Sequence, residues 1–179
     1  MNSKANKKVL FVAQAAIIAA LYAALTYAQN MLLPGTTSMA VQFRLSEALT
    51  LLSVFTPAAI PGLTIGCVAA NLMNVSVLPL DMILGSLATL LAAIAMYLLR
   101  HVCVKKIPLL SAMMPAVFNG IIIGLEIEIF FIDGPFNFVS FLIQAGCVFL
   151  GELAVCMTVG LVLVAVIQKR GLDKKLMLS

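Results

Sequence analysis

The sequence predicts an all-α membrane protein in which six transmembrane helices form one bundle, a single domain over residues 1–179. Of its residues, 63% are hydrophobic and only 10% are charged, which leaves too little polar surface for a soluble domain. The mean hydropathy is +1.15, and the apolar stretches approach the roughly 20 residues that a helix needs to cross a bilayer. Nearly the whole chain is therefore expected in the membrane.

Polar residues, proline and glycine divide the chain into six apolar segments. The first, at about 8–29, is longer than the apolar part of a signal peptide and is expected to be retained as a helix. A loop at 30–42 follows, and its length makes it a candidate lid over a site. The second segment, at about 43–55, ends at Thr56-Pro57.

The third segment, at about 58–75, starts directly after that proline. The last three segments lie at about 81–100, 109–131 and 137–169, and each is long enough for a full span. The second and third are short, which favours tilted helices or partial penetration of the bilayer.

The placement of lysine and arginine predicts the orientation, because cations near helix ends stay on the cytoplasmic side. With six spans, ten of the eleven cations share one side: Lys4, Lys7, Lys8, Arg100, Lys105, Lys106, Lys169, Arg170, Lys174 and Lys175. Arg44 alone falls on the other side. Both termini are therefore expected in the cytoplasm, and the net charge of +4 reflects topology rather than nucleic-acid binding.

Several polar side chains fall inside the predicted spans, where a charge costs roughly 2.5–3.5 kcal/mol on insertion scales. Glu47 and Asn71 are placed roughly 5 Å below the outer surface, Glu126 about 7 Å and Gln144 about 10 Å. We expect an outward-facing polar cavity that gathers residues of several helices: Arg44, Glu47, Asn71, Asn74, Asp81, Asn119, Glu126 and Gln144.

The same polar residues also fit purely structural roles. Those near helix ends can simply reach headgroup water. Arg44 and Glu47, three residues apart, can form a structural ion pair. Glu152 lies at about the depth of Asn119 and is expected to make a buried polar contact with it.

The first segment carries two rows of alanine, Ala15/Ala19/Ala23 and Ala16/Ala20/Ala24. Small residues four apart let two helices approach closely. The rows can pack within the bundle, but they occupy nearly half of the helix circumference, more than one internal neighbour needs. A membrane partner bound through Ala15, Ala16, Ala19, Ala20 and Ala23 is the sharper interpretation.

The motifs of nucleotide hydrolysis, zinc proteases and serine hydrolases are missing, and the four cysteines form no metal-binding pattern. We therefore expect no catalytic residues, no metal and no cofactor. Three classes of function remain: a substrate-binding component, an ion-coupled carrier that uses Glu126 or Glu152 as a proton site, and a membrane scaffold.

The segment Val41-Gln-Phe-Arg-Leu-Ser-Glu-Ala-Leu-Thr-Leu-Leu52, then Phe55-Thr-Pro-Ala-Ala-Ile-Pro-Gly62 and Gly66-Cys-Val-Ala-Ala-Asn71, resembles the QueT family. This is a family of substrate-binding S components of energy-coupling factor (ECF) transporters. The resemblance implies a protein that presents its ligand to a transmembrane T subunit, which two cytoplasmic ATPases drive.

The ligand that the resemblance implies is a queuosine precursor, queuine or queuosine, all of them 7-deazaguanines. The guanine-like edge has adjacent N–H donors that a carboxylate accepts, and a carbonyl that wants a donor. Glu47 and Glu126 are the carboxylate candidates, and Phe43, Phe136 and Phe138 are candidates for stacking on the ring. An S component for another vitamin-like substrate is the alternative.

Overall fold

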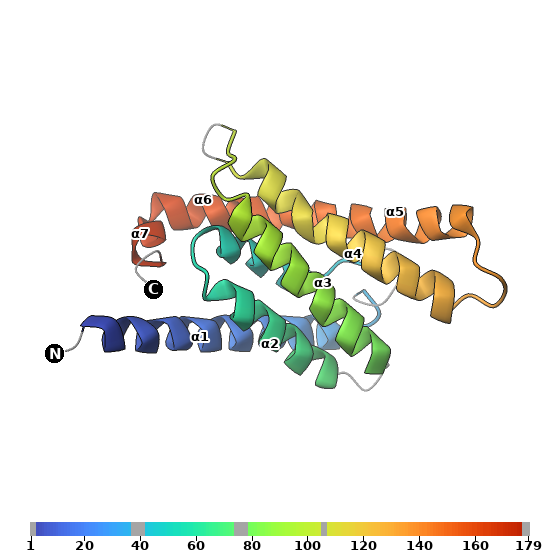
Figure 1. Ribbon diagram of the computed structural model, residues 1–179, viewed down its shortest axis with the longest axis horizontal. Coiled ribbons are helices and arrows are strands. Elements are labelled where there is room, and N and C mark those ends of the chain that lie inside the picture. The colour runs from blue at the N-terminus through green and yellow to red at the C-terminus, as the bar shows by residue number, and fades with distance from the viewer. Residues whose placement is uncertain (1–2, 37–41, 74–78, 105–106, 177–179) are drawn as a thin grey trace.

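The computed structural model describes residues 3–36, 42–73, 79–104 and 107–176, and these fold into a helical bundle (Figure 1). The helices are α1 (Ser3–Leu32), the 3-10 helix η1 (Leu45–Val54), α2 (Ala59–Leu72), α3 (Pro79–Leu98), α4 (Leu109–Phe130), α5 (Phe138–Val155), the π-helical turn η2 (Cys156–Gly160), α6 (Leu161–Lys169) and α7 (Leu172–Leu176). The predicted all-helical fold class is confirmed.

Four stretches of helix are long and apolar enough to cross a membrane: Asn6–Leu32, Pro79–Leu98, Leu109–Phe130 and Phe138–Lys169. Leu45–Val54 and Ala59–Leu72 are apolar but shorter, as the sequence predicts for the second and third segments. The two ends of the chain lie at the same end of the bundle, and the α4–α5 connection lies at the opposite end (Figure 1).

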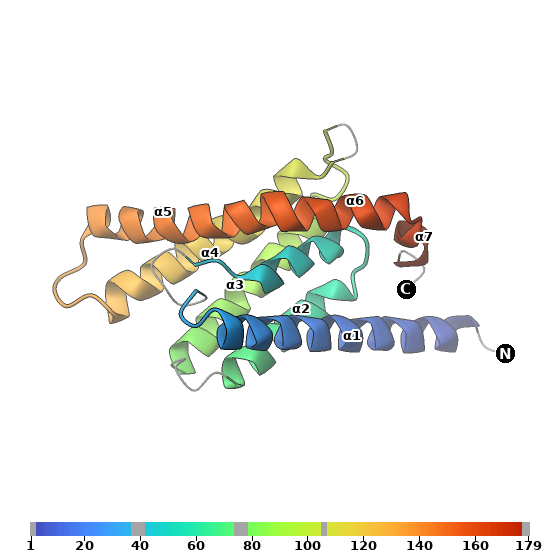
Figure 2. The same cartoon turned by 180° about the vertical axis from the view of Figure 1, so that it is seen from behind.

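The short helix η1 is the centre of the molecule. It lies between α1 and the α5–α6 helix (Figure 2), and it contacts every other described helix except α7. The sequence predicts a helix here, and the structure shows that it is a 3-10 helix. With three residues per turn, side chains three apart line up: Arg44, Glu47, Thr50 and Ser53 form a polar row, and Leu45, Ala48, Leu51 and Val54 an apolar one.

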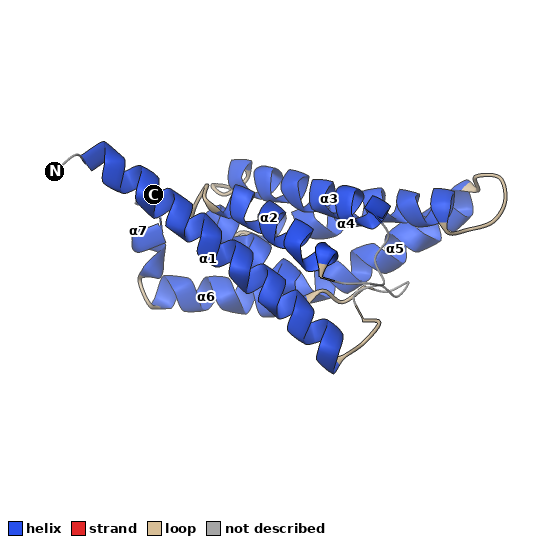
Figure 3. Cartoon of the chain, turned by 90° about the horizontal axis from the view of Figure 1, so that it is seen from below, coloured by secondary structure: helices blue, strands red, loops and turns tan. Residues whose placement is uncertain are grey.

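α1 and α2 pack closely because glycine faces alanine between them. A Cβ on Gly62 would lie 2.7 Å from the Ala15 carbonyl oxygen, and one on Gly66 would lie 2.8 Å from the Ala19 carbonyl oxygen. α1 crosses the bundle at an angle with α2 beside it (Figure 3). The Gly-x-x-x-Gly row of α2 therefore has an internal function.

The predicted sixth helix is interrupted by η2, which separates α5 from α6. The π-helical turn lies against η1: a Cβ on Gly160 would lie 3.0 Å from a Leu51 methyl carbon, and the Cys156 thiol lies 3.8 Å from the Glu47 carbonyl oxygen. A π-helical turn contains one residue more than an α-helical turn, so the residues after it lie on a different face of the helix from the one that a regular α-helix would give. Apolar periodicity alone does not reveal such a shift.

Candidate functional site

The entry to η1 is fixed by Gln29 at the end of α1. Its side-chain oxygen accepts from the Leu45 amide at 2.8 Å, and its amide nitrogen donates to the Phe43 carbonyl and, at 3.0 Å, to the Thr36 hydroxyl. Gln29 is 4% exposed, so these bonds are shielded from competing solvent. Residues 37–41 of the candidate lid lie outside the described part of the chain, and Gln29 binds Thr36 before them and Phe43 after them.

Two hydrogen bonds join α1 to η1 one turn deeper. The Tyr22 hydroxyl donates to the Glu47 carboxylate, and the Thr26 hydroxyl donates to Ser46 at 2.8 Å. Tyr22, Ser46 and Glu47 are all at most 1% exposed. Because Tyr22, Thr26 and Gln29 recur at helical spacing, one face of α1 is dedicated to η1.

Arg44 lies at the start of η1, where several helices meet. An added Cβ on Gly85 of α3 would lie 3.8 Å from the Arg44 guanidinium and 3.6 Å from the Asn71 side-chain amide. The guanidinium interacts electrostatically with Glu47 and with Glu152 of α5. Glycine at position 85 thus leaves room for two polar side chains from different helices to meet.

Two further polar pairs lie around this centre. Asp81 of α3 and Glu126 of α4 have carboxyl groups within interaction distance of each other. Asn119 of α4 and Glu152 of α5 also interact, as the sequence predicts, although neither Glu152 oxygen makes a hydrogen bond of standard geometry. Glu126 and Glu152 are at most 2% exposed.

We call the set that these contacts bring together the Arg44 cluster: Tyr22, Arg44, Glu47, Cys67, Asn71, Asp81, Thr89, Asn119, Glu126 and Glu152. Within it, one Glu47 oxygen and both oxygens of Glu126 and Glu152 are buried with no hydrogen-bond partner among the described residues. Buried polar atoms in native proteins are normally paired with protein, water or ligand. The cluster therefore has spare capacity to accept hydrogen bonds from water or a ligand.

Comparison with protein families identifies the chain. The family model described as QueT transporter matches residues 12–169, which is most of the chain. The chain belongs to the QueT transporter family. Comparison with curated proteins and with solved structures finds no match. Family membership indicates a membrane transport protein rather than an enzyme.

The structure of this QueT family member brings six of the nine predicted ligand-binding residues into the Arg44 cluster: Arg44, Glu47, Asn71, Asp81, Asn119 and Glu126. Gln144 is half-buried, two turns before Glu152 on α5. The Phe43 side chain is exposed. Asn74 lies outside the described residues.

Phe138 is the first residue of α5, roughly 20 Å along the helix from Glu152. Its ring packs against Phe141 at 6.0 Å, and Phe136 also packs against Phe141, at 6.2 Å. Phe136 and Phe138 are both more than half exposed. In this structure the three phenylalanines form a group of their own at the start of α5.

Sequence reasoning missed three members of the cluster. Tyr22 lies in an alanine-rich apolar helix, where a tyrosine does not stand out. Its spacing to Thr26 and Gln29 is the signal that could have found it, because the three residues share one face of the helix. Cys67 and Thr89 connect α2 to α3 through a 3.6 Å contact between hydroxyl and sulfur, and Asn71 lies 3.8 Å from the same sulfur. No motif singles out Cys67 or Thr89, because each is a common residue in an apolar helix.

The two alanine rows of α1 have different surroundings. Ala15, Ala19 and Ala23 are half-buried, and the first two lie against the glycines of α2. Ala16, Ala20 and Ala24 are exposed on the surface of the bundle. Of the two rows, only this second one is therefore available to a partner in the folded chain.

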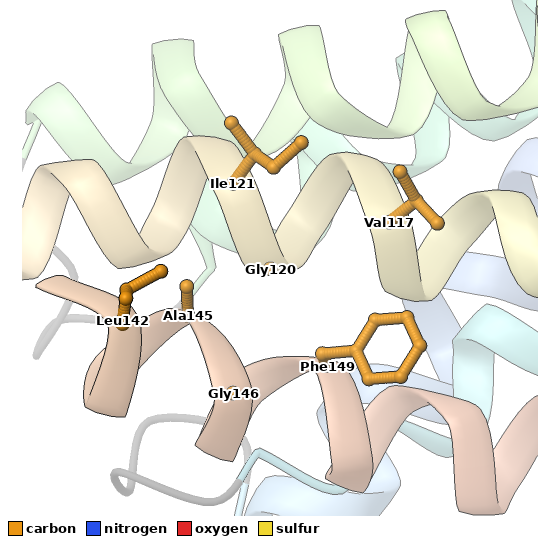
Figure 4. A pocket seen from close by; sticks show the side chains of 7 residues that line it. All are labelled: Val117, Gly120, Ile121, Leu142, Ala145, Gly146 and Phe149. Carbon is orange, nitrogen blue, oxygen red and sulfur yellow. The ribbon is translucent and has the colours of Figure 1, made fainter.

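A groove between α4 and α5 lies outside the cluster (Figure 4). Its lining is apolar throughout: Val117, Gly120, Ile121, Leu142, Ala145, Gly146 and Phe149. Next to the groove the two helices touch at Gly124, where an added Cβ would lie only 2.7 Å from the Ala145 backbone. It has no group that would orient a polar ligand, so the Arg44 cluster is the candidate site. The described residues also include no group of three potential metal ligands.

Proposed function

We propose that this protein is the S component of an ECF transporter and that it captures a 7-deazaguanine, either a queuosine precursor or queuine or queuosine, in the Arg44 cluster. It then presents the ligand to a T subunit driven by two ATPases. The observation that carries the proposal is a buried, acceptor-rich cluster in a QueT transporter family member.

The chemistry of the cluster supports a flat, N–H-rich ligand. A carboxylate accepts two parallel N–H bonds from a guanine-like edge, and Glu47 and Glu126 both have buried oxygens without partners among the described residues. The side chains of Arg44 and Asn71 are donors suited to the carbonyl of the same edge. In this proposal both termini lie in the cytoplasm and the ligand enters from the outside.

Isothermal titration calorimetry with 7-aminomethyl-7-deazaguanine tests the proposal in detergent. Glu47→Gln and Glu126→Gln keep the side-chain shape but turn one acceptor into a donor that faces ligand donors. Leaving buried donors unpaired costs about 1–3 kcal/mol, so each variant is expected to bind about tenfold to a hundredfold more weakly.

Asp133→Asn is the matched control, because Asp133 is an exposed acid in the α4–α5 connection. It is expected to bind like the parent. If both glutamate variants also bind like the parent, the ligand site is elsewhere and the cluster is structural. If the parent binds no 7-deazaguanine, the substrate assignment is wrong.

A further inference from the structure

We infer that Asp81 and Glu126 form a subsite for a positively charged ammonium group of the substrate. The inference rests on the proposed function and adds to it the chemical class of the substituent that the site selects. It is carried by the register of two helices, by the burial of Glu126 and by the excess of acceptor atoms in the Arg44 cluster.

The packing of α3 against α4 places the two carboxyl groups at the same level. The Ser111 hydroxyl of α4 lies 3.5 Å from the Met96 carbonyl of α3, which fixes the antiparallel register. Asp81 lies fifteen residues before Met96, and Glu126 lies fifteen residues after Ser111. Equal displacements along antiparallel helices bring the two acids opposite each other, and their carboxyl groups interact.

Glu126 is buried against another acid. It is 2% exposed, neither of its carboxylate oxygens makes a hydrogen bond of standard geometry with a described residue, and the Asp81 carboxyl group is the acid that it interacts with. Leaving such a group unpaired is costly in a low-dielectric interior, and a second carboxyl group nearby adds repulsion. Asp81, by contrast, is half-buried.

The excess of acceptor atoms in the cluster favours a ligand group that is rich in donors. Arg44 interacts electrostatically with Glu47, Glu126 and Glu152, so one guanidinium is shared by three glutamates, with Asp81 as a fourth acid. Among the buried atoms of the cluster without partners, five are carboxylate oxygens, and the only donor is the Asn119 amide nitrogen. An ammonium brings three donors and one positive charge to these acceptors.

Arg44 lies between the two groups of acids. Its guanidinium lies beside Gly85, one helical turn from Asp81, and it also interacts electrostatically with Glu47 of η1. A guanine-like edge held by Glu47 would leave the Asp81–Glu126 pair for a substituent of the ring. Two carboxyl groups around one ammonium form the stronger, charge-assisted type of hydrogen bond.

Two ligands of the same shape test the inference: 7-aminomethyl-7-deazaguanine, which carries an ammonium, and 7-hydroxymethyl-7-deazaguanine, which is neutral. We expect the parent to prefer the ammonium ligand at least about tenfold, since hydrogen bonds to charged groups contribute about 1.5–3 kcal/mol. Glu126→Gln and Asp81→Asn are each expected to reduce that preference to about threefold or less.

Binding of the hydroxymethyl ligand is measured in parallel for both variants, so that a loss common to the two ligands is separated from a loss of the preference between them. Glu128→Gln is the matched control: this acid is two residues away, is 3% exposed and accepts from the Asn137 amide at 2.9 Å. It should keep the full preference.

Equal binding of the two ligands by the parent would overturn the subsite while leaving the proposed function intact. An unchanged preference in Glu126→Gln and Asp81→Asn would overturn it as well. Failure of the parent to bind either ligand would overturn the proposed function and the subsite together.

Discussion

Tyr22 and Glu47 show how single residues make this site. Glu47 is 0% exposed, and of its two carboxylate oxygens one accepts from the Tyr22 hydroxyl while the other has no partner among the described residues. Tyr22 thus holds the carboxylate in one orientation, and under the proposed function the second oxygen would accept from the ligand. Thr50 supports the same turn by donating to the Glu47 carbonyl at 2.5 Å.

Removing the Tyr22 hydroxyl should destabilise the protein. Tyr22→Phe leaves a buried carboxylate oxygen unpaired, which is expected to lower the free energy of unfolding by about 1–3 kcal/mol. Denaturant unfolding in detergent measures this. Tyr27→Phe on the same helix is the control, because Tyr27 is 42% exposed, and a change within about 0.5 kcal/mol is expected. Equal stability of the two variants would show that the Tyr22–Glu47 bond contributes nothing.

At the scale of elements, α1 has three functions on three faces. Tyr22, Thr26 and Gln29 bind η1, Ala15 and Ala19 receive α2, and Ala16 and Ala20 remain exposed. Only 22% of its apolar window is buried, against 39% or more for the other three long helices. A largely unburied helix with a row of small residues suits contact with another membrane protein.

Leucine substitutions separate the two alanine faces. Ala16→Leu with Ala20→Leu is expected to abolish ligand uptake in cells while the purified protein binds ligand as before, because bulk is added only to the exposed face. Ala15→Leu with Ala19→Leu adds bulk where Gly62 and Gly66 already touch. It should lower stability by about 1–3 kcal/mol per site.

Uptake assays with parallel binding measurements compare the two double variants. Normal uptake by the Ala16/Ala20 variant would rule out this face as the transporter contact. If the Ala16/Ala20 variant lost both ligand binding and folding, this face of α1 would pack inside the bundle instead.

At the scale of the whole molecule, the arrangement of helix ends agrees with the charge pattern. Both chain ends lie at one end of the bundle (Figure 1), where the sequence also puts most lysines and arginines. The α4–α5 connection with Asp133 lies at the other end. The cytoplasmic position of the termini remains a prediction.

Cys103 allows a direct test of that orientation, since it is exposed in the α3–α4 connection. In intact cells a membrane-impermeant maleimide should fail to label Cys103 and should label it after permeabilisation. Asp133→Cys in a Cys103→Ser background is expected to give the reverse pattern. Cys67 and Cys156 are buried and should stay unlabelled. Labelling of Cys103 from outside would invert the predicted topology.

The sequence by itself determined the membrane-helical class, the order of the segments and most of the polar residues of the site. These follow from transfer free energy, because apolar length and the cost of a buried charge are properties of the chain alone. The period of three in η1, from Arg44 to Ser53, is also present in the sequence, although the pattern alone indicates only a helix.

Tertiary structure decided which of these residues meet. The pairing of Asp81 with Glu126 depends on the register of α3 against α4, and the contact of Tyr22 with Glu47 joins residues 25 apart. The π-helical turn η2 sets Cys156 and Gly160 against η1. Register, helix crossing and side-chain contact are decided by packing between distant segments, where shape and close approach of backbones count. The periodicity of the sequence shows on which face of its own helix a residue lies. Which other helix that face contacts is decided only by the packing of the whole chain.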